Sequence, residues 1–261
     1  MKGAFSMILG AQLYTVREYT KTLEGFAQTL KKVADIGYTT VQVSGTCDFE
    51  PEWLRDRLQE TGLRCILTHT NPTRIEKETD AVLAAHRIFG CSCVGIGMAP
   101  GGMEEYDGFV HIFKPVSQKI AKAGLQLAYH NHNIEFARTG RDHELFFDRI
   151  LQDFTPRELA ITFDTYWAQA AGADPAAWLR KLSGRVQNIH LKDMCMAPGE
   201  GMRGARMAAV GEGNMNFEAI LAAAQDAGTQ YAFVEQDDCY GEDPFACLET
   251  SYRNLRALGL K

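Results

Sequence analysis

Carboxylates and imidazoles stand at the ends of several short apolar segments of this chain. Asp164, His190 and Glu235 each close such a segment, and His130 closes another. Two carboxylates with an imidazole form a ligand set for a divalent cation, and oxygen-rich sets of this kind suit Mn²⁺, Mg²⁺ or Co²⁺ better than a thiolate zinc site does. Because buried carboxylates without partners are costly, we expect a bound divalent ion, with Zn²⁺ as a further option.

These side chains can meet only if the segments that carry them are neighbouring strands with a common inner face. Side chains alternate between the two faces of a strand, and a face covered by helices is apolar. With Ile189 and Leu191 on the outer face, His190 and its second neighbour Lys192 point inward. The same alternation turns five more polar residues inward: His130, His132, Asp164, Glu235 and Asp237.

Eight apolar segments alternate with helical patterns along the chain. Strands are predicted at 8–15, 40–44, 65–70, 93–98, 125–131, 159–165, 186–192 and 231–237. Six helices are predicted at 23–36, 52–61, 77–89, 106–123, 216–227 and 244–258, each followed by a glycine that can terminate it. Asp174-Pro175 and Asp243-Pro244 are typical helix starts.

Eight such units in 261 residues predict an α/β fold, a single (β/α)8 TIM barrel that spans residues 1–261 as one domain. In that fold the active site lies at the carboxyl ends of the strands, where the polar residues stand. A doubly wound open sheet is the rival fold, but no G-x-G-x-x-G motif follows the first predicted strand.

The composition favours a protein of the reducing cytoplasm. The formal net charge of −6 argues against binding to nucleic acid or to a membrane surface. The seven cysteines form no C-x-x-C pair, and neither a signal peptide nor an apolar run long enough to span a bilayer is found. Residues 194–214, rich in Gly and Met, are predicted to form a long functional loop. The sequence is compatible with a homo-oligomer.

The strings LGAQLYTVRE, LAYHNHNIEF, ITFDTYW, VQNIHLKDM, VGEGNMNFEAI and FVEQDDCYGEDPF resemble those of the xylose isomerase-like TIM barrel superfamily. Its members are often called sugar phosphate isomerases/epimerases, and the resemblance covers essentially the whole chain. It implies a sugar or keto-sugar bound to the metal through a carbonyl and a neighbouring hydroxyl. It also implies proton transfer next to that carbonyl through an enediolate.

In the epimerase branch of the superfamily, a Glu, an Asp, a His and a Glu from strands five to eight hold the metal. The last three correspond to Asp164, His190 and Glu235. His130 stands at the position of the first, and Glu135 is the nearest carboxylate. Either His130 is the fourth ligand, or Glu135 is the ligand and His130 serves as a base; we favour the second arrangement.

The resemblance, together with the strand ends, predicts further roles. Glu235 and His130 are candidate bases, and Lys192 is placed to stabilise developing negative charge. Trp167 replaces a histidine of the epimerases, which disfavours a strict ketose 3-epimerase, and Arg206 corresponds to a substrate-binding arginine of that branch. Substrate contacts are therefore expected from four residues: His69, His132, Trp167 and Arg206.

The main prediction is a divalent-metal-dependent sugar isomerase/epimerase. A metal-dependent dehydratase/lyase on a keto-sugar or inosose is the alternative, because loss of a β-hydroxyl can follow the same proton abstraction. An endonuclease IV-like nuclease would need a larger histidine-rich zinc cluster and a DNA-binding surface, which the acidic composition disfavours. A non-catalytic sugar-binding barrel is a further class. No glycine-rich phosphate cradle is found, so a free sugar is favoured over a sugar phosphate.

Overall fold

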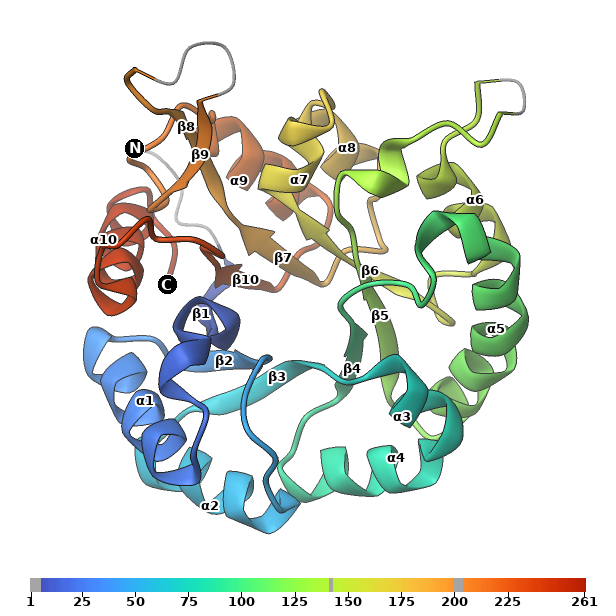
Figure 1. Cartoon of the computed structure of the whole chain (residues 1–261), viewed down its shortest axis with the longest axis horizontal. Coiled ribbons are helices and arrows are strands. Elements are labelled where there is room, and N and C mark those ends of the chain that lie inside the picture. The colour runs from blue at the N-terminus through green and yellow to red at the C-terminus, as the bar shows by residue number, and fades with distance from the viewer. Residues whose placement is uncertain (1–5, 141–142, 200–203) are drawn as a thin grey trace.

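Eight parallel strands close into a barrel in the structure of this chain, a computed structural model that describes residues 6–140, 143–199 and 204–261 (Figure 1). The order around the barrel is β1-β2-β3-β4-β5-β6-β7-β10, and β10 pairs with β1 to close it. The predicted (β/α)8 barrel is confirmed. The strands are β1 Ile8–Gln12, β2 Thr40–Val43, β3 Arg64–His69, β4 Cys93–Ile96, β5 Gln126–His130, β6 Ala160–Asp164, β7 Asn188–Leu191 and β10 Tyr231–Val234.

An outer ring of helices surrounds the strands (Figure 1). All six predicted helices are found, and the glycine after each has a positive φ. Three more, α3, α6 and α7, were not predicted, because segments of six to eight residues are too short to show a helical period. No helix in the described residues is long and apolar enough to cross a membrane. The helices are α1 Leu23–Ile36, α2 Pro51–Thr61, α3 Pro72–Lys77, α4 Thr79–Ile88, α5 Tyr106–Lys122, α6 Phe146–Asp153, α7 Thr165–Ala170, α8 Pro175–Lys181, α9 Phe217–Asp226 and α10 Pro244–Ala257, with 3₁₀ turns η1 Leu13–Tyr19, η2 Gly102–Glu105 and η3 Ile134–Phe136.

Two apolar clusters separate the outside of the strands from the inside. On β5, Leu127 and Tyr129 belong to the large cluster beneath the helices, whereas Ala128 between them belongs to a small cluster. The predicted alternation is therefore confirmed. The ring of Phe233 helps to fill the small cluster, and a Cβ added at Gly10 would lie 2.5 Å from it. The small cluster consists of Leu67, Cys93, Ala128, Ala160 and Phe233.

The segment after β7 differs from the irregular loop that was predicted. It contains an antiparallel hairpin of β8 Asp193–Met196 and β9 Ala205–Ala208, while residues 200–203 lie outside the described part of the chain. The Asp193 carboxylate fixes the base of this segment. It accepts hydrogen bonds from the backbone N–H groups of Gly211 and Gly213, both at 2.9 Å, and of Met194 at 2.7 Å. One buried carboxylate thus joins the start of the hairpin to the turn that precedes α9.

Replacing this carboxylate is expected to destabilise the fold. In Asp193→Asn an amide NH₂ faces backbone N–H donors, so the free energy of unfolding should fall by about 1.5–3 kcal/mol, the range for hydrogen bonds to a charged group. Urea denaturation measures the change. Asp226→Asn, at an exposed position on α9, is the matched control. Ordinary surface substitutions change the free energy of unfolding by less than about 0.5 kcal/mol. A change of that size or smaller in Asp193→Asn would contradict this role.

Candidate metal centre and active site

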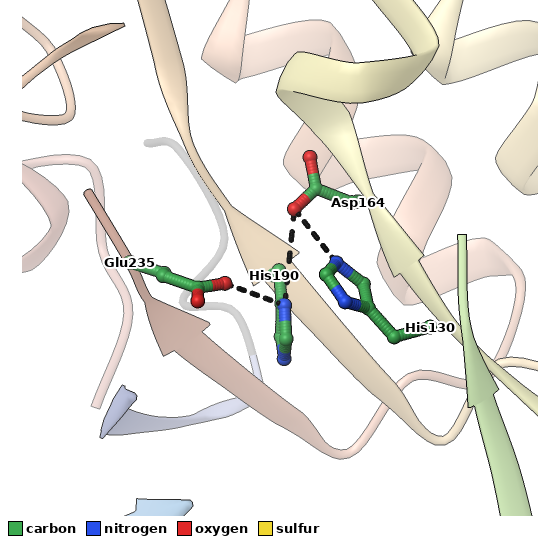
Figure 2. Close-up of side chains that lie close together, drawn as sticks. All are labelled: His130, Asp164, His190 and Glu235. Carbon is green, nitrogen blue, oxygen red and sulfur yellow. Dashed lines mark hydrogen bonds and ion pairs between the residues drawn. The ribbon is translucent and has the colours of Figure 1, made fainter. Parts of the chain in front are cut away.

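Four side chains converge at the carboxyl ends of the barrel strands (Figure 2). His130 ends β5, Asp164 ends β6, His190 lies within β7, and Glu235 follows β10. One ligand atom from each lies within 4.8 Å of the others, and all four residues are buried. The structure therefore brings together the three residues expected from strands six to eight, with His130 as the fourth member. We call this group the four-residue cluster.

His190 is oriented by a residue that the sequence analysis did not identify. Its Nε2 lies 2.6 Å from Gln42 Oε1, so the N–H on that side donates to the amide oxygen. The other nitrogen, Nδ1, lies 2.8 Å from Glu235 Oε2 and 3.8 Å from Asp164 Oδ2 (Figure 2). Burial alone would lower the pKa of His190, but Glu235 and Asp164 outweigh it and raise that pKa. Without a proton, Nδ1 would present a lone pair to two carboxylates. That arrangement is repulsive unless a proton or a metal cation lies between them.

The two carboxylate oxygens of Asp164 have different hydrogen-bond partners. Oδ1 accepts a hydrogen bond of 2.9 Å from the backbone N–H of Trp167 and so caps α7. Oδ2 faces the cluster and lies 3.1 Å from His130 Nε2. Burial alone would raise the pKa of this carboxyl, but the charge of Lys192 and hydrogen bonds from His130 and His190 hold it well below its usual range. Asp164 is therefore an anion fixed to the rigid start of a helix.

Lys192 brings a positive charge into the same buried space. Its Nζ lies 3.1 Å from Glu235 Oε2, 3.3 Å from Asp164 Oδ2 and 2.9 Å from both oxygens of Asp237. Burial would lower the pKa of this amine, yet the three carboxylates raise it. The carboxylates themselves differ. Burial would raise the pKa of Glu235, but Lys192 and His190 hold it below its usual range. Burial and the charge of Glu235 raise the pKa of Asp237 to about 7.

Glu135, expected as the fourth ligand, is held elsewhere. Its fully buried carboxylate accepts hydrogen bonds of 2.5 Å from the Tyr129 hydroxyl and 2.6 Å from the backbone N–H of His132. The 3₁₀ turn η3 follows β5 closely and folds Glu135 back toward the outward-facing Tyr129. The arrangement thus favours His130 as the fourth group. Burial lowers the pKa of His130 to about 3, which leaves its ring neutral and able to bind a cation.

Aromatic rings extend the cluster toward the barrel mouth. The His69 ring stacks on that of His130 with centroids 5.2 Å apart, and the His132 ring lies 4.6 Å from His130 and 5.4 Å from Trp167. Three shielded nitrogens have no hydrogen-bond partner within the described chain: His69 Nε2, His132 Nδ1 and Trp167 Nε1. These three expected substrate-contact residues therefore present polar atoms that a ligand could satisfy. Arg206 instead lies on β9, with its guanidinium carbon 4.7 Å from the centre of the Tyr240 ring.

Two glutamines that the sequence analysis missed complete the polar layer. Gln12 and Gln42 are partners in the pairing of β1 with β2, and both are buried. The Nε2 of each lacks a hydrogen-bond partner among the residues that the structure describes. The alternation that selected the inward residues of strands five to eight would also have selected these two. A polar side chain on the inner face of an apolar strand was the signal.

Known proteins resemble this chain in sequence and in fold. Inosose dehydratase from Lacticaseibacillus casei is 21% identical to this chain over 238 residues, and the match covers 78% of each chain. Inosose dehydratase from Geobacillus thermodenitrificans is 25% identical over 148 residues, and the match covers 51% of this chain and 48% of the relative. Among solved structures, a sugar phosphate isomerase/epimerase from Parabacteroides distasonis has a TM-score of 0.77 at 21% identity and covers 98% of this chain and 96% of that chain. L-ribulose 3-epimerase has a TM-score of 0.72 at 15% identity, with 97% and 94% covered.

The relatives thus include proteins named as isomerases or epimerases and as dehydratases. Residues 30–246, well over half of the chain, match the family model described as xylose isomerase-like TIM barrel. Together with the closed barrel of eight parallel strands, this match shows that the chain belongs to the xylose isomerase-like TIM barrel family.

Proposed function

We propose that this protein is a divalent-metal-dependent sugar isomerase or epimerase. The observation that supports this function most directly is the buried group of His130, Asp164, His190 and Glu235, whose ligand atoms lie within 4.8 Å of one another, as a metal site requires. With His130 in place of a carboxylate the donor set has two imidazoles, which suits Mn²⁺, Co²⁺ or Zn²⁺ better than Mg²⁺. The substrate is a small sugar or keto-sugar.

The residues of the cluster divide the work of proton transfer. A bound divalent ion supplies a Lewis acid that polarises a carbonyl and acidifies the neighbouring C–H. Glu235, held ionised beside Lys192, is the base that accepts that proton. The Lys192 ammonium lies next to the negative charge that develops and stabilises it. On the β5 side, the unpartnered Nδ1 of His132 offers a second proton carrier. Return of the proton to carbon gives an isomer or an epimer.

Dehydration is the second candidate, because relatives named inosose dehydratase match 78% of the chain. It begins with the same proton abstraction and requires an acid to protonate a departing hydroxyl. Asp237 fits this need, since burial raises its pKa to about 7 and the half-buried side chain lies beside Lys192. A group with that pKa is partly protonated at neutral pH and can donate.

Removal of metal should abolish proton exchange. After treatment with EDTA, the exchange of substrate C–H protons with D₂O, followed by NMR over ketoses and 3-keto-sugars, is expected to stop, and Mn²⁺ should restore it. Metal analysis of the untreated protein should find an ion stoichiometric with the chain. Exchange that continues unchanged in EDTA would rule out the metal-dependent reaction. The position that exchanges and the product formed distinguish isomerisation from dehydration.

Replacing the proposed base should slow exchange even when metal is saturating. Glu235→Gln is expected to lower the rate roughly 10²–10⁴-fold, the usual contribution of a positioned base. Measurement at increasing Mn²⁺ separates loss of the base, which added metal does not rescue, from weakened metal binding, which it does. Glu249→Gln, at an exposed position on α10, serves as control. A Glu235→Gln enzyme with the wild-type rate cannot use this carboxylate as its base.

Gln42 should determine how tightly the metal binds without contacting it. Gln42→Leu removes the acceptor of the His190 N–H and is expected to weaken Mn²⁺ binding roughly 10–100-fold, as for other outer partners of metal ligands. Gln42→Glu retains an acceptor oxygen and should bind Mn²⁺ within a few-fold of wild type. Calorimetric titration of the EDTA-stripped protein measures both. Equal affinities in Gln42→Leu and wild type would contradict the positioning role.

A further inference from the structure

A cavity on the β2–β3 side of the barrel reaches His69, whose ring stacks on His130 of the four-residue cluster. Its volume is about 790 Å³, and its walls come from the segments after β2 and β3 and from α3 and α4. These elements lie next to one another in the ring of helices (Figure 1). Ligand pockets span roughly 300–1,000 Å³. The size therefore suits a ligand group larger than the carbonyl-bearing sugar ring alone. We call this hollow the β2–β3 cavity.

His69 forms a wall shared by the β2–β3 cavity and the cluster. It lines the cavity, and its ring also stacks on His130 and lies 5.7 Å from the centre of the His190 ring. Its Nδ1 is 3.3 Å from Ser44 Oγ, another lining atom, while its Nε2 is shielded from solvent and has no hydrogen-bond partner among the described residues. The β2–β3 cavity and the four-residue cluster are therefore separated by the thickness of one imidazole ring.

The lining of the β2–β3 cavity carries no excess of positive charge. Two cationic residues, Arg74 and Lys77, face three acidic ones, Asp48, Glu50 and Glu78. The guanidinium of Arg74 is already paired, with its Nε 3.4 Å from a carboxylate oxygen of Glu78. A phosphate group calls for a cluster of unopposed cationic or backbone N–H donors, which this lining does not supply. The group that fits here is uncharged.

The remaining lining suits a polyhydroxylated group. Short hydroxyl and amide side chains make up much of the wall: Ser44, Thr46, Thr68, Thr70, Asn71 and Thr73. Such groups both donate and accept, as sugar hydroxyls do. Phe49 and Phe89 add apolar surface, with ring centroids 6.3 Å apart in an edge-to-face contact. A few oriented polar groups on a partly aromatic wall are typical of small-molecule sites.

We propose that the substrate is a glycoside with two sugar units, in which the reacting unit lies at the four-residue cluster and an uncharged second unit occupies the β2–β3 cavity. This inference rests on the proposed function for the reacting unit. The second unit contacts neither the metal nor the base. The second unit contributes binding free energy. A tenfold preference for the two-unit substrate over a one-unit substrate corresponds to about 1.4 kcal/mol of that free energy.

The test compares one-unit and two-unit probes in wild type and in a variant that fills the β2–β3 cavity. The probes are a 3-keto-hexose, its methyl glycoside and a disaccharide oxidised at C3 of one ring. Thr73→Trp places a bulky ring in the cavity from an exposed position on α3, and Glu76→Trp places the same ring on α3 at a position outside the lining. Proton exchange in D₂O gives kcat/KM for each probe. Circular dichroism confirms that both variants are folded.

Wild type should prefer the disaccharide over the one-unit probes by at least about tenfold in kcat/KM, the ratio that corresponds to 1.4 kcal/mol. Thr73→Trp should remove most of that preference, and Glu76→Trp should keep it. Exchange of all probes at similar rates, or an unchanged preference in Thr73→Trp, would overturn the cavity assignment and leave the proposed function standing.

A binding measurement covers the case in which no probe exchanges. That outcome would overturn the proposed function, and calorimetric titration with the unoxidised disaccharide and monosaccharide then tests the β2–β3 cavity alone. Tighter binding of the disaccharide in wild type, lost in Thr73→Trp and kept in Glu76→Trp, would support the second-unit site. Equal binding of the two sugars in all three proteins would overturn it.

Discussion

The structure depends on how it compensates buried negative charge at the mouth of the barrel. Asp164 and Glu235 are almost fully shielded from water, where an uncompensated carboxylate is costly. Lys192 contacts both at 3.1–3.3 Å, but it also contacts Asp237, so carboxylates outnumber the one ammonium. The ring of His130 is neutral, whereas Glu235 and Asp164 outweigh burial and raise the pKa of His190, which favours a proton on its Nδ1. The buried carboxylates are therefore balanced by Lys192 and by the proton of His190, and the proposed metal ion would take the place of that proton.

Barrel geometry makes such a concentration of charge feasible. Asp164 and His190 are register partners of β6 and β7, and His190 is in turn paired with Phe233 of β10. His190 therefore lies beside Phe233, a member of the small apolar cluster inside the barrel. An apolar neighbour keeps the local dielectric low, which strengthens the electrostatic interactions of the site.

Strand parity made much of the fold and cluster predictable. The alternation of apolar and polar residues on β5, β6, β7 and β10 located Asp164, His190 and Glu235 because inner and outer faces differ in polarity. Glu135 could not be placed in this way, since it lies beyond the strand in a 3₁₀ turn whose hydrogen bonds to Tyr129 and His132 fix its direction. The β8–β9 hairpin escaped prediction for a similar reason: its pairing is stabilised by distant contacts of Asp193 rather than by a local pattern.

The two halves of the barrel carry different chemistry. The proposed metal ligands come from β5, β6, β7 and the end of β10. In contrast, β2, β3 and the segments after them carry amides, hydroxyls and the mixed-charge lining of the β2–β3 cavity. Gln42 and His69 link the halves, because Gln42 orients His190 and His69 packs against His130. A group bound on the β2–β3 side would therefore contact residues that position the proposed metal ligands. Binding energy gained far from the reacting carbon can in this way align the catalytic groups, which is how remote contacts raise the rate of a chemical step.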